Sequence, residues 1–577
     1  MIKKLLTCVR EYKAPTLLTP LCMVLEVTME VIIPFVMARL IDFGIDAGDM
    51  NAILRYGGIL IGVCAVSLFG GAMAGRFAAT ASCGFAKNLR HDMYHAVQGY
   101  SFKSIDKFST ASIVTRLTTD ISRLQMAYQM SIRIAVRAPV TLTLALIMAF
   151  QVNERISLIF VGIIPVLALG MVYIMTHARP VFERVFKMYD ELNNVVQENV
   201  RGIRVVKAFV REAYETSKFG KVSQDIYRDF SKAEKTTALG GPLMQLCMYS
   251  CMLLAAWFGA RLIVAGDMTT GELMSIIYYS MQILMSLMML SMVFIMLIMS
   301  RASGERVAEI LEEESDIANP ASPVREKPSG DIEFDDVDFS YAGDVNKLCL
   351  RDITLRIREG ETIGVIGGTG AGKSSLVQLI PRLYDATQGA VRVGGRDVRE
   401  YDLETLREAV SVVLQKNELF SGTVAENLRW GDPDATDEEL VAACRIAEAD
   451  EFIRKMPDGY ETHIEQGGTN VSGGQKQRLC IARALLKKPA VLILDDSTSA
   501  VDTATDARIK AALKTTMPKT TKLVIAQRIS GVQDADRIIV MDNGRIDAVG
   551  THDELLKTNT IYQEVYESQI KGGDFDE

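Results

Sequence analysis

The 577-residue chain has few of the residues that build disulfide scaffolds or metal centres. It contains nine cysteines and five histidines, and the cysteines form no Cys-x-x-Cys pair and accompany no cluster of histidines. Cys247 and Cys251, the most closely spaced pair, have helical spacing in an apolar segment, where packing explains them better than zinc binding. The net charge of −8 argues against a nucleic-acid partner. The start of the chain leads into a long apolar segment without a small-residue cleavage site, so we expect no cleavable signal peptide.

Long apolar stretches dominate the first half of the sequence, and 49% of the chain is hydrophobic. Several reach the length of about 20 residues that a helix needs to cross a bilayer. We predict membrane spans at 15–41, 56–80, 133–152, 156–177, 240–265 and 273–299. From about residue 331 onward the sequence has the pattern of a soluble α/β domain. The sequence therefore predicts an all-α membrane domain over 1–314, a linker over 315–330 interrupted by prolines, and an α/β domain over 331–577.

The connections between the predicted spans differ in charge. The short connections 42–51 and 266–272 contain acidic residues and no Lys or Arg, whereas the two long connections are rich in both. Basic connections stay on the cytoplasmic side. We therefore expect a cell-membrane protein whose termini and long connections all lie on the cytoplasmic side. The long connections have a helical pattern, and we expect their helices to continue beyond the bilayer and to turn back near 108–111 and 209–213.

Two acidic side chains lie inside the first predicted span. Glu26 and Glu30 are four residues apart and share one face of a helix. An ionised carboxylate in hydrocarbon is costly, so such residues usually face a cavity or a partner. They could attract a cationic or hydrogen-bonding substrate, or neighbouring helices or interfacial water could satisfy them, and the sequence favours neither alternative. The sixth span is rich in methionine, which suits an adaptable surface, although packing or lipid contact explains most of these residues better.

A phosphate-binding loop lies in the soluble half. The pattern Gly-x4-Gly-Lys-Ser spans 367–374, follows the predicted strand 362–366 and leads into a predicted helix, which is the context that this motif requires. Its glycines let backbone N–H groups approach phosphate oxygens, Lys373 balances the terminal phosphates and Ser374 offers a hydroxyl to Mg²⁺. The pattern predicts an ATP site formed by Gly367, Thr369, Gly370, Ala371, Gly372, Lys373, Ser374 and Ser375.

A second motif narrows the class of protein. The sequence Ser-Gly-Gly-Gln at 472–475 precedes a predicted helix, about twenty residues before an apolar strand that ends at Asp495. With these motifs in this order the chain resembles the ATP-binding cassette (ABC) family. Six spans followed by one cassette resemble a half-transporter of the exporter type, and the resemblance covers the whole chain. It implies a helical membrane domain joined to an α/β cassette that uses ATP and Mg²⁺.

The resemblance implies a role for each residue that matches the family pattern. Tyr341 would stack on adenine, Asp495 would hold Mg²⁺, and Gln415 would reach both Mg²⁺ and the attacking water. The segment 499–502, which ends with Asp502, would cross the seam between two cassettes. Two cassettes in this family sandwich two ATP molecules, so each site borrows its signature motif from the other chain. The signature residues here are Ser472, Gly473, Gly474 and Gln475.

Among the departures from the family pattern, two belong to the same ATP site. Asp496 stands where a glutamate usually polarises the attacking water, and Gln527 stands where a histidine is usual. The Asp496 side chain is one methylene shorter, and a displacement of about 1 Å at a reacting group can cost about 10²-fold in rate. Gln527 cannot act as a cation or transfer a proton, although it can hydrogen-bond a γ-phosphate. We expect ATP binding with poor hydrolysis, the alternative being that Asp496 serves as a slower base.

A degenerate hydrolytic site beside an intact signature is typical of one half of a heterodimer. The chain is similar to the asymmetric bacterial multidrug exporters, which implies export of a small hydrophobic or amphipathic substrate and hydrolysis mainly at the partner's site. The alternative is a homodimeric exporter of one dedicated lipid, peptide or haem-related substrate with two slow sites. An ATP-gated membrane protein of another class would need a regulatory insertion before the cassette, and the short linker offers none.

Overall fold

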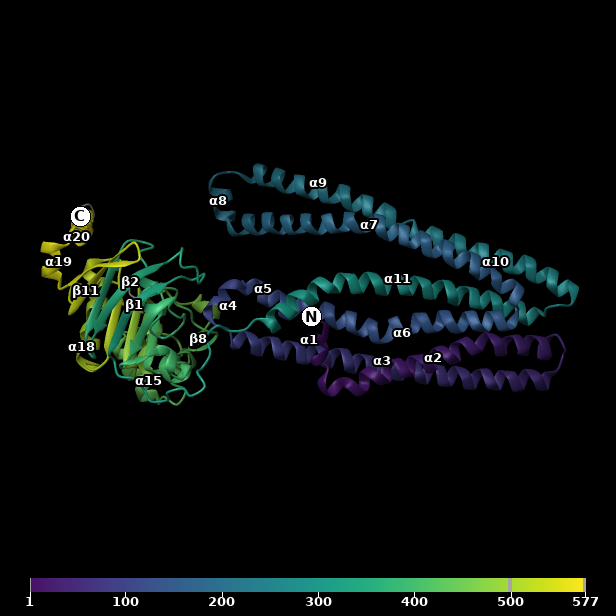
Figure 1. Ribbon diagram of the computed structural model, residues 1–577, viewed down its shortest axis with the longest axis horizontal. Helices are drawn as coiled ribbons and strands as arrows, with labels where there is room; N and C mark the ends of the chain where they lie inside the picture. The colour runs from purple at the N-terminus through teal and green to yellow at the C-terminus, as the bar shows by residue number, and fades with distance from the viewer. Residues whose placement is uncertain (1, 497–500, 574–577) are drawn as a thin grey trace. The chain divides into compact units, whose positions relative to one another are not determined.

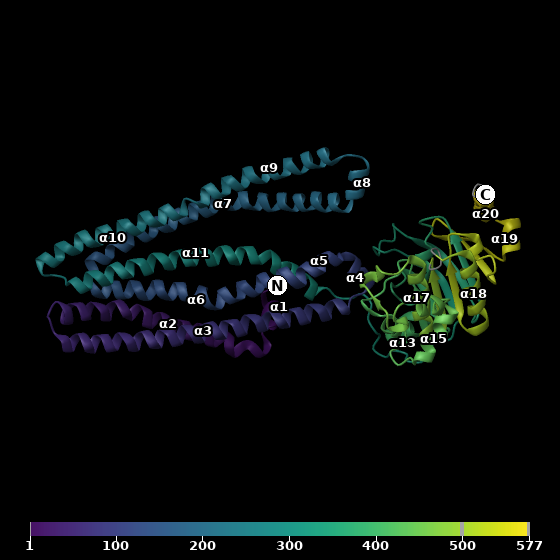
Figure 2. The same ribbon diagram turned by 180° about the vertical axis from the view of Figure 1, so that it is seen from behind.

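The computed structural model describes residues 2–496 and 501–573, and the chain divides into two compact units. One unit contains the chain up to Gln98 together with Thr110–Glu313, and the other contains Gly99–Ser109 together with the chain from Glu314 onward. The sequence analysis assigned 1–314 to the membrane domain, whereas Gly99–Ser109 groups with the second unit in the structure. Figures 1 and 2 show the long helices of the first unit and the mixed helices and strands of the second.

The first unit consists of helices, most of them long. They are α1 (Ile2–Thr7), α2 (Lys13–Leu40), α3 (Met50–Gln98), α5 (Thr110–Thr115), α6 (Ile121–Val152), α7 (Glu154–Arg201), α8 (Ile203–Ala208), α9 (Glu212–Thr237), α10 (Gly240–Ala265) and α11 (Thr270–Glu312). Within the described residues, six helical stretches are long and apolar enough to cross a membrane, and each contains one of the six predicted spans. The prediction of a multi-pass membrane protein is confirmed.

Two helices of the first unit are much longer than a bilayer is thick. The helices α3 and α7 contain 49 and 48 residues, which corresponds to about 70 Å each at about 1.5 Å per residue. The hydrocarbon core is only about 30 Å thick, so both helices continue well beyond it. The chain reverses after α3 within Gly99–Ser109, around the short helix α4 (Phe102–Lys107), and after α7 around α8 and residues 209–211. Both reversals lie at or within a few residues of the predicted turns.

Small and apolar side chains fill the core of the first unit. Val27 and Val31 of α2 pack with Ala145 and Ala149 of α6, and with a group from α7, α10 and α11. Cys247 and Cys251 belong to the same core, and both are buried. Their role is therefore packing, as the sequence suggested. In both views α7 and α9 run side by side and end at α8, the tip of a helical hairpin (Figures 1 and 2).

The second unit is built around two main sheets. The six-stranded sheet has the order β12-β11-β3-β10-β9-β6, and the four-stranded sheet has the order β2-β1-β4-β5. The strands are β1 (Ile332–Phe339), β2 (Leu350–Ile357), β3 (Thr362–Gly367), β4 (Gln388–Val393), β5 (Arg396–Asp397), β6 (Val410–Val413), β9 (Val491–Asp495), β10 (Thr521–Ile525), β11 (Arg537–Asp542) and β12 (Arg545–Gly550), with β7 (Gly422–Thr423) and β8 (His463–Ile464) forming a separate pair.

Helices cover this α/β framework. They are α12 (Lys373–Gln378), α13 (Leu403–Ala409), α14 (Val424–Arg429), α15 (Asp437–Ile446), α16 (Asp450–Arg454), α17 (Gly473–Leu486), α18 (Thr503–Thr516), α19 (His552–Thr558) and α20 (Thr560–Gly573). The strands β9 and β10 are buried along their whole length, as expected for parallel strands covered on both faces. The strands β3, β6, β9, β10 and β11 are parallel, so their carboxyl ends meet at one edge of the sheet. Ligands bind at this edge in open α/β sheets.

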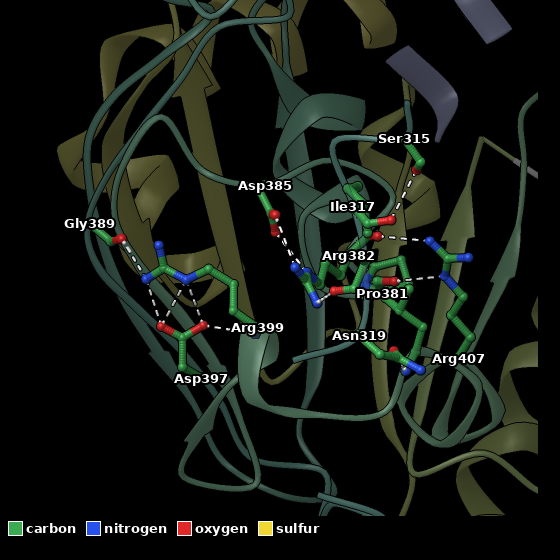
Figure 3. A network of polar contacts seen from close by, with 12 residues as sticks. Ser315, Ile317, Asn319, Pro381, Arg382, Asp385, Gly389, Asp397, Arg399 and Arg407 are labelled. Atoms are coloured by element: carbon green, nitrogen blue, oxygen red, sulfur yellow. Dashed lines mark hydrogen bonds and ion pairs between the residues drawn. The ribbon is translucent and has the colours of Figure 1, made fainter. Parts of the chain in front are cut away.

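The start of the linker is tied to the second unit by polar contacts (Figure 3). The Asn319 side chain donates to Asp402 Oδ1 at 2.8 Å and accepts from the Leu403 backbone N–H at 2.9 Å. It therefore provides an acceptor for the first backbone N–H of α13. Arg382 donates to the Ala318 carbonyl at 3.3 Å and is held by Asp385. The prolines prevent a continuous helix here, and side chains from the second unit hold the extended chain instead.

The segment Gly99–Ser109 belongs with the second unit because of contacts to Tyr384. The Tyr384 hydroxyl donates to Asp106 Oδ2 at 2.7 Å, and the Phe102 ring lies 6.1 Å from the Tyr384 ring, centroid to centroid. These side chains come from α4, the helix at the first reversal. The side chains of α4 thus hold Gly99–Ser109 within the second unit.

Candidate functional site

Every predicted residue of this chain's own hydrolytic site follows a parallel strand. The phosphate-binding loop follows β3, Gln415 follows β6, Asp495 ends β9, and Gln527 follows β10. In the sheet, Ile525 of β10 pairs with Asp495 of β9 and with Val365 of β3. The strand order therefore brings side chains from four distant parts of the sequence to one edge.

The phosphate-binding loop has a backbone that only glycine adopts easily. Gly370 and Gly372 have φ of +83° and +94°, in the left-handed region. A Cβ atom on Gly372 would also lie 2.8 Å from Leu350 Cδ2 and 3.1 Å from the Cys349 carbonyl oxygen. Lys373 Nζ donates to the carbonyl oxygens of Gly367 and Gly368, both at 2.9 Å. Its ammonium group therefore lies over the loop, with Thr369 and Ala371 between the glycines and Ser375 in the first turn of α12.

Burial shifts the pKa values of two charged residues at the ATP site, Lys373 and Asp495. Burial lowers the pKa of Lys373, although Asp495 and Asp496 oppose this effect. Burial also raises the pKa of Asp495, as does the charge of Asp496, whereas a hydrogen bond from Ser374 acts in the opposite direction. Asp495 is buried at the end of β9 with the Ser374 hydroxyl beside it. A hydroxyl and a carboxylate are oxygen donors of the kind that Mg²⁺ prefers.

Asp496 lies at the centre of the residues predicted to handle water and the γ-phosphate. Its Oδ2 accepts a hydrogen bond from Gln527 Nε2 at 2.8 Å and a longer one from Gln415 Nε2 at 3.4 Å. The Asp496 backbone has φ of +48° and its N–H donates to the Ile525 carbonyl at 3.0 Å. The two departures from the family pattern, Asp496 and Gln527, are therefore bonded directly to each other.

Tyr341 forms an aromatic group beside the phosphate-binding loop. Its hydroxyl shares a hydrogen bond of 2.9 Å with Ser375 Oγ and donates to Gln378 Oε1 at 3.2 Å. Its ring meets Phe339 and Tyr384 edge-on, with centroids 4.8 and 5.0 Å away. The side chain is thus held from two sides and remains partly exposed, which suits a platform for an adenine ring.

The signature motif lies at the start of α17. Ser472 accepts from the Gln475 backbone N–H at 3.3 Å, and the Gln475 side chain accepts from the Ser472 backbone N–H at 2.9 Å, so the two residues form a capping box. Ser472 and Gly473 are exposed, and Gly474 follows in the first turn. The positive end of a 14-residue helix is therefore presented to the outside of this chain.

Asp502 is the described end of the segment expected to cross the seam. It caps α18 by accepting from the Thr505 backbone N–H at 2.9 Å, and this hydrogen bond lowers its pKa. Residues 499 and 500 of the predicted segment 499–502 lie outside the described residues.

The acidic pair in the first span has a partner that the sequence analysis missed. Arg137 of α6 donates to Glu26 Oε1 and to Glu30 Oε2, both at 2.7 Å. Each carboxylate therefore has one hydrogen bond from a neighbouring helix, as the structural alternative expects. Glu26 Oε2 is buried, and none of the described residues donates a hydrogen bond to it. An arginine within a predicted apolar span was the available signal, because such a residue normally has an acidic partner.

Comparison with known proteins agrees with this architecture. Residues 16–288 match the ABC transporter transmembrane region, and residues 350–499 match the ABC transporter family. The chain is 34% identical over 569 residues to an uncharacterized ABC transporter ATP-binding protein of Bacillus subtilis, YfiB, with 99% of each chain covered. It is 35% identical over 566 residues to a protein of the same description from Mycobacterium tuberculosis, with 97% of each covered.

A relative with a more specific name is the ATP-dependent lipid A-core flippase of Hahella chejuensis. It is 32% identical over 517 residues, covering 89% of this chain and 88% of the relative. These matches run through both the helical unit and the nucleotide site. The chain therefore belongs to the ABC transporter family and is a membrane half-transporter of the exporter type, with an ATPase domain coupled to transport.

Proposed function

We propose that this chain is one half of a heterodimeric ABC exporter and that its own ATP site binds nucleotide but hydrolyses it slowly. The bond between Gln527 and Asp496 carries this proposal. Asp496 Oδ2 already accepts hydrogen bonds from two amides, so an attacking water must compete for that oxygen. The carboxylate is also one methylene shorter than that of glutamate, and a misplacement of about 1 Å can cost about 10²-fold.

ATP would be held by residues that the structure brings to one edge of the sheet. The adenine would lie against Tyr341, and the phosphates would lie on the backbone N–H groups of the loop and beside Lys373. Ser374 and Asp495 provide the hydroxyl and the carboxylate that would hold Mg²⁺, with Gln415 at the same edge. When bound, Mg²⁺ would neutralise charge on the phosphates of ATP.

Two exposed surfaces support a second chain as partner. The capped signature at Ser472 and Gly473 is exposed, so it would be accessible to the ATP site of another chain. The reversal after α7 is also apolar and exposed, with Val205, Phe209 and Val210 at 61%, 73% and 79% exposure. Exposed apolar clusters of this kind mark interaction sites. We infer that this tip contacts the partner half-transporter, whose own site would carry the glutamate and the histidine.

Replacing the two unusual residues tests the proposal. Asp496→Glu, alone and with Gln527→His, is measured for ATP hydrolysis in the full chain reconstituted in lipid. We expect Asp496→Glu to raise the rate by about 10²-fold, because it restores the reach of the carboxylate. Asp458→Glu, the same exchange at an exposed turn, is the matched control and should not change the rate. If Asp496→Glu were no faster than the unaltered chain, slow hydrolysis would have another cause.

The transported substrate is proposed to be a small hydrophobic or amphipathic compound. The sixth span presents a group of exposed methionines, whose flexible side chains adapt to varied shapes. They are Met281, Met285, Met288, Met289, Met292 and Met299. A dedicated lipid-like substrate is the second candidate, and the flippase relatives at 32% and 33% identity favour it. Transport of one lipid class by the chain without any partner would support that second candidate, the homodimeric exporter.

Glu26 and Glu30 remain the proposed contacts for a cationic substrate. Two carboxyl groups share one guanidinium near the middle of α2, so the acidic groups outnumber the basic group there. Transport by Glu26→Gln and Glu30→Gln should fall for cationic compounds and stay unchanged for neutral compounds of similar size. Glu234→Gln, on the exposed face of α9, is the control. Equal effects on cationic and neutral compounds would leave Glu26 and Glu30 with a structural role only.

A further inference from the structure

The segment that carries Gln527 is held by a residue far away in the sequence. Gln569 on α20 donates from Nε2 to the Gln527 carbonyl at 2.9 Å. Its Oε1 accepts from the Ile529 backbone N–H at 2.8 Å. One side-chain amide therefore bridges the backbone of two residues that flank Arg528. Neither bond belongs to a helix or a sheet, so Gln569 restrains a loop that would otherwise have fewer fixed contacts.

The helix that carries Gln569 is firmly anchored. Tyr562 of α20 is fully buried, and its backbone N–H donates to Asn559 Oδ1 at 2.8 Å. Its hydroxyl lies 2.7 Å from His552 Nδ1. Tyr562 also belongs to the same apolar core as Ile529, one of the residues that Gln569 bridges. The restraint therefore connects two parts of one packed region, and its geometry is set by that packing.

The restraint continues from the backbone into the ATP site. Gln569 fixes the carbonyl of Gln527, and the Gln527 side chain in turn donates to Asp496 Oδ2 at 2.8 Å. Two hydrogen bonds on the backbone at 527–529 limit the directions in which the Gln527 side chain can point. A group that is held in place before its ligand arrives loses less conformational freedom on binding, which increases affinity.

We propose that Gln569 is a positioning residue that holds Gln527 in reach of the γ-phosphate of ATP. This inference rests on the proposed role of the site in binding ATP. Adenine and the first two phosphates depend on Tyr341 and the loop around Lys373, which Gln569 does not contact. Loss of Gln569 should therefore weaken the binding of ATP, which has a γ-phosphate, and leave the binding of ADP unchanged.

The test compares the affinities of ATP and ADP for the full chain in lipid nanodiscs. Two hydrogen bonds of ordinary net strength correspond to a loss of about fivefold to 10²-fold in ATP affinity for Gln569→Ala. ADP affinity should stay within about twofold, the change expected from non-contacting substitutions of about 0.4 kcal/mol. Gln569→Glu keeps the acceptor for Ile529 but loses the donor for Gln527, so it should lower ATP affinity less than Gln569→Ala and still spare ADP.

Two further variants complete the experiment. Gln527→Ala should lower ATP affinity, and adding Gln569→Ala to it should cause no further loss, because both act through one side chain. Gln563→Ala is the matched control, since Gln563 lies on the same helix and its side chain donates to the nearby Leu556 carbonyl. It should leave the ratio of ATP to ADP affinity unchanged.

Three results would overturn the inference. An unchanged ratio in Gln569→Ala would show that Gln569 does not position Gln527. Equal losses for both nucleotides would show general damage to the domain instead of positioning. If the unaltered chain bound neither nucleotide, the proposed ATP site itself would be wrong, which separates that failure from a failure of Gln569 alone.

Discussion

An ion pair between Asp120, directly before α6, and Arg306 of α11 leads to an asymmetric prediction about stability. Asp120 ends the π-helical turn Arg116–Asp120 just before α6, and its side chain is only 1% exposed. It accepts from Arg306 Nε at 2.8 Å, Arg306 Nη2 at 2.5 Å and Ser303 Oγ at 2.8 Å. The Arg306 side chain is 41% exposed. We predict that Arg306→Ala destabilises this junction more than Asp120→Asn does.

The expected loss of stability in each variant depends on which charged group remains without its partner. Arg306→Ala leaves a carboxylate buried with one hydroxyl donor, and removing one partner of a buried pair costs about 3–5 kcal/mol. Asp120→Asn leaves a guanidinium that water can reach, so the loss is that of hydrogen bonds to a charged group, about 1.5–3 kcal/mol. The double variant Asp120→Asn with Arg306→Ala should cost less than the sum, because no charge then remains buried.

Hydrogen exchange of the full chain in lipid measures the local stability around Asp120 and Arg306. Peptides that cover 113–124 and 300–310 should exchange about 10²-fold to several times 10³-fold faster in Arg306→Ala, since about 1.4 kcal/mol corresponds to tenfold. Asp120→Asn should increase exchange by only about tenfold to 10²-fold. Arg301→Ala, which removes an exposed pair with Glu305 one turn earlier in α11, is the control. Equal or greater exchange in Asp120→Asn would refute the reasoning.

Two further predictions concern the second unit. Tyr384→Phe removes the hydrogen bond to the exposed Asp106, so amides of 99–109 should exchange about twofold to tenfold faster, and unchanged exchange would contradict the contact. Burial raises the pKa of Asp450, but hydrogen bonds from Arg454 and Tyr460 outweigh it and hold that pKa below its usual value. The full chain with Asp450→Asn should therefore be less stable than the unaltered chain at pH 7 in urea unfolding. The difference should shrink as the pH falls below about 4 through the folded-state pKa, and a difference independent of pH would contradict this.

The parts of the fold and site that could be predicted from sequence are those with local rules. Apolar length predicted all six spans, because a helix must match the bilayer. The order of a glycine-rich loop, a signature and an apolar strand ending at Asp495 predicted the cassette. Since parallel strands share one edge for their carboxyl ends, the convergence of Gln415, Asp496 and Gln527 follows from the same motifs.

Contacts between distant side chains could not be predicted in this way. The bond between Arg137 and the acidic pair depends on α2 and α6 lying side by side, and no periodicity in either helix reveals that neighbour. The sequence pattern assigns Gly99–Ser109 to a hairpin of the membrane domain. In the structure its side chains contact the Tyr384 hydroxyl and ring, so it belongs to the second unit. Gln569 has no motif at all, because its role depends on where α20 packs.

The central claim is that this chain holds ATP in a site that hydrolyses it poorly. The most direct measurement is the ATPase rate of the purified chain alone in lipid, with ATP binding measured in the same sample. We predict binding that Lys373→Ala abolishes, together with turnover about 10²-fold below that of the Asp496→Glu variant. An ordinary exporter rate in the unaltered chain, abolished by Lys373→Ala, would contradict the claim and show that Asp496 is a competent base.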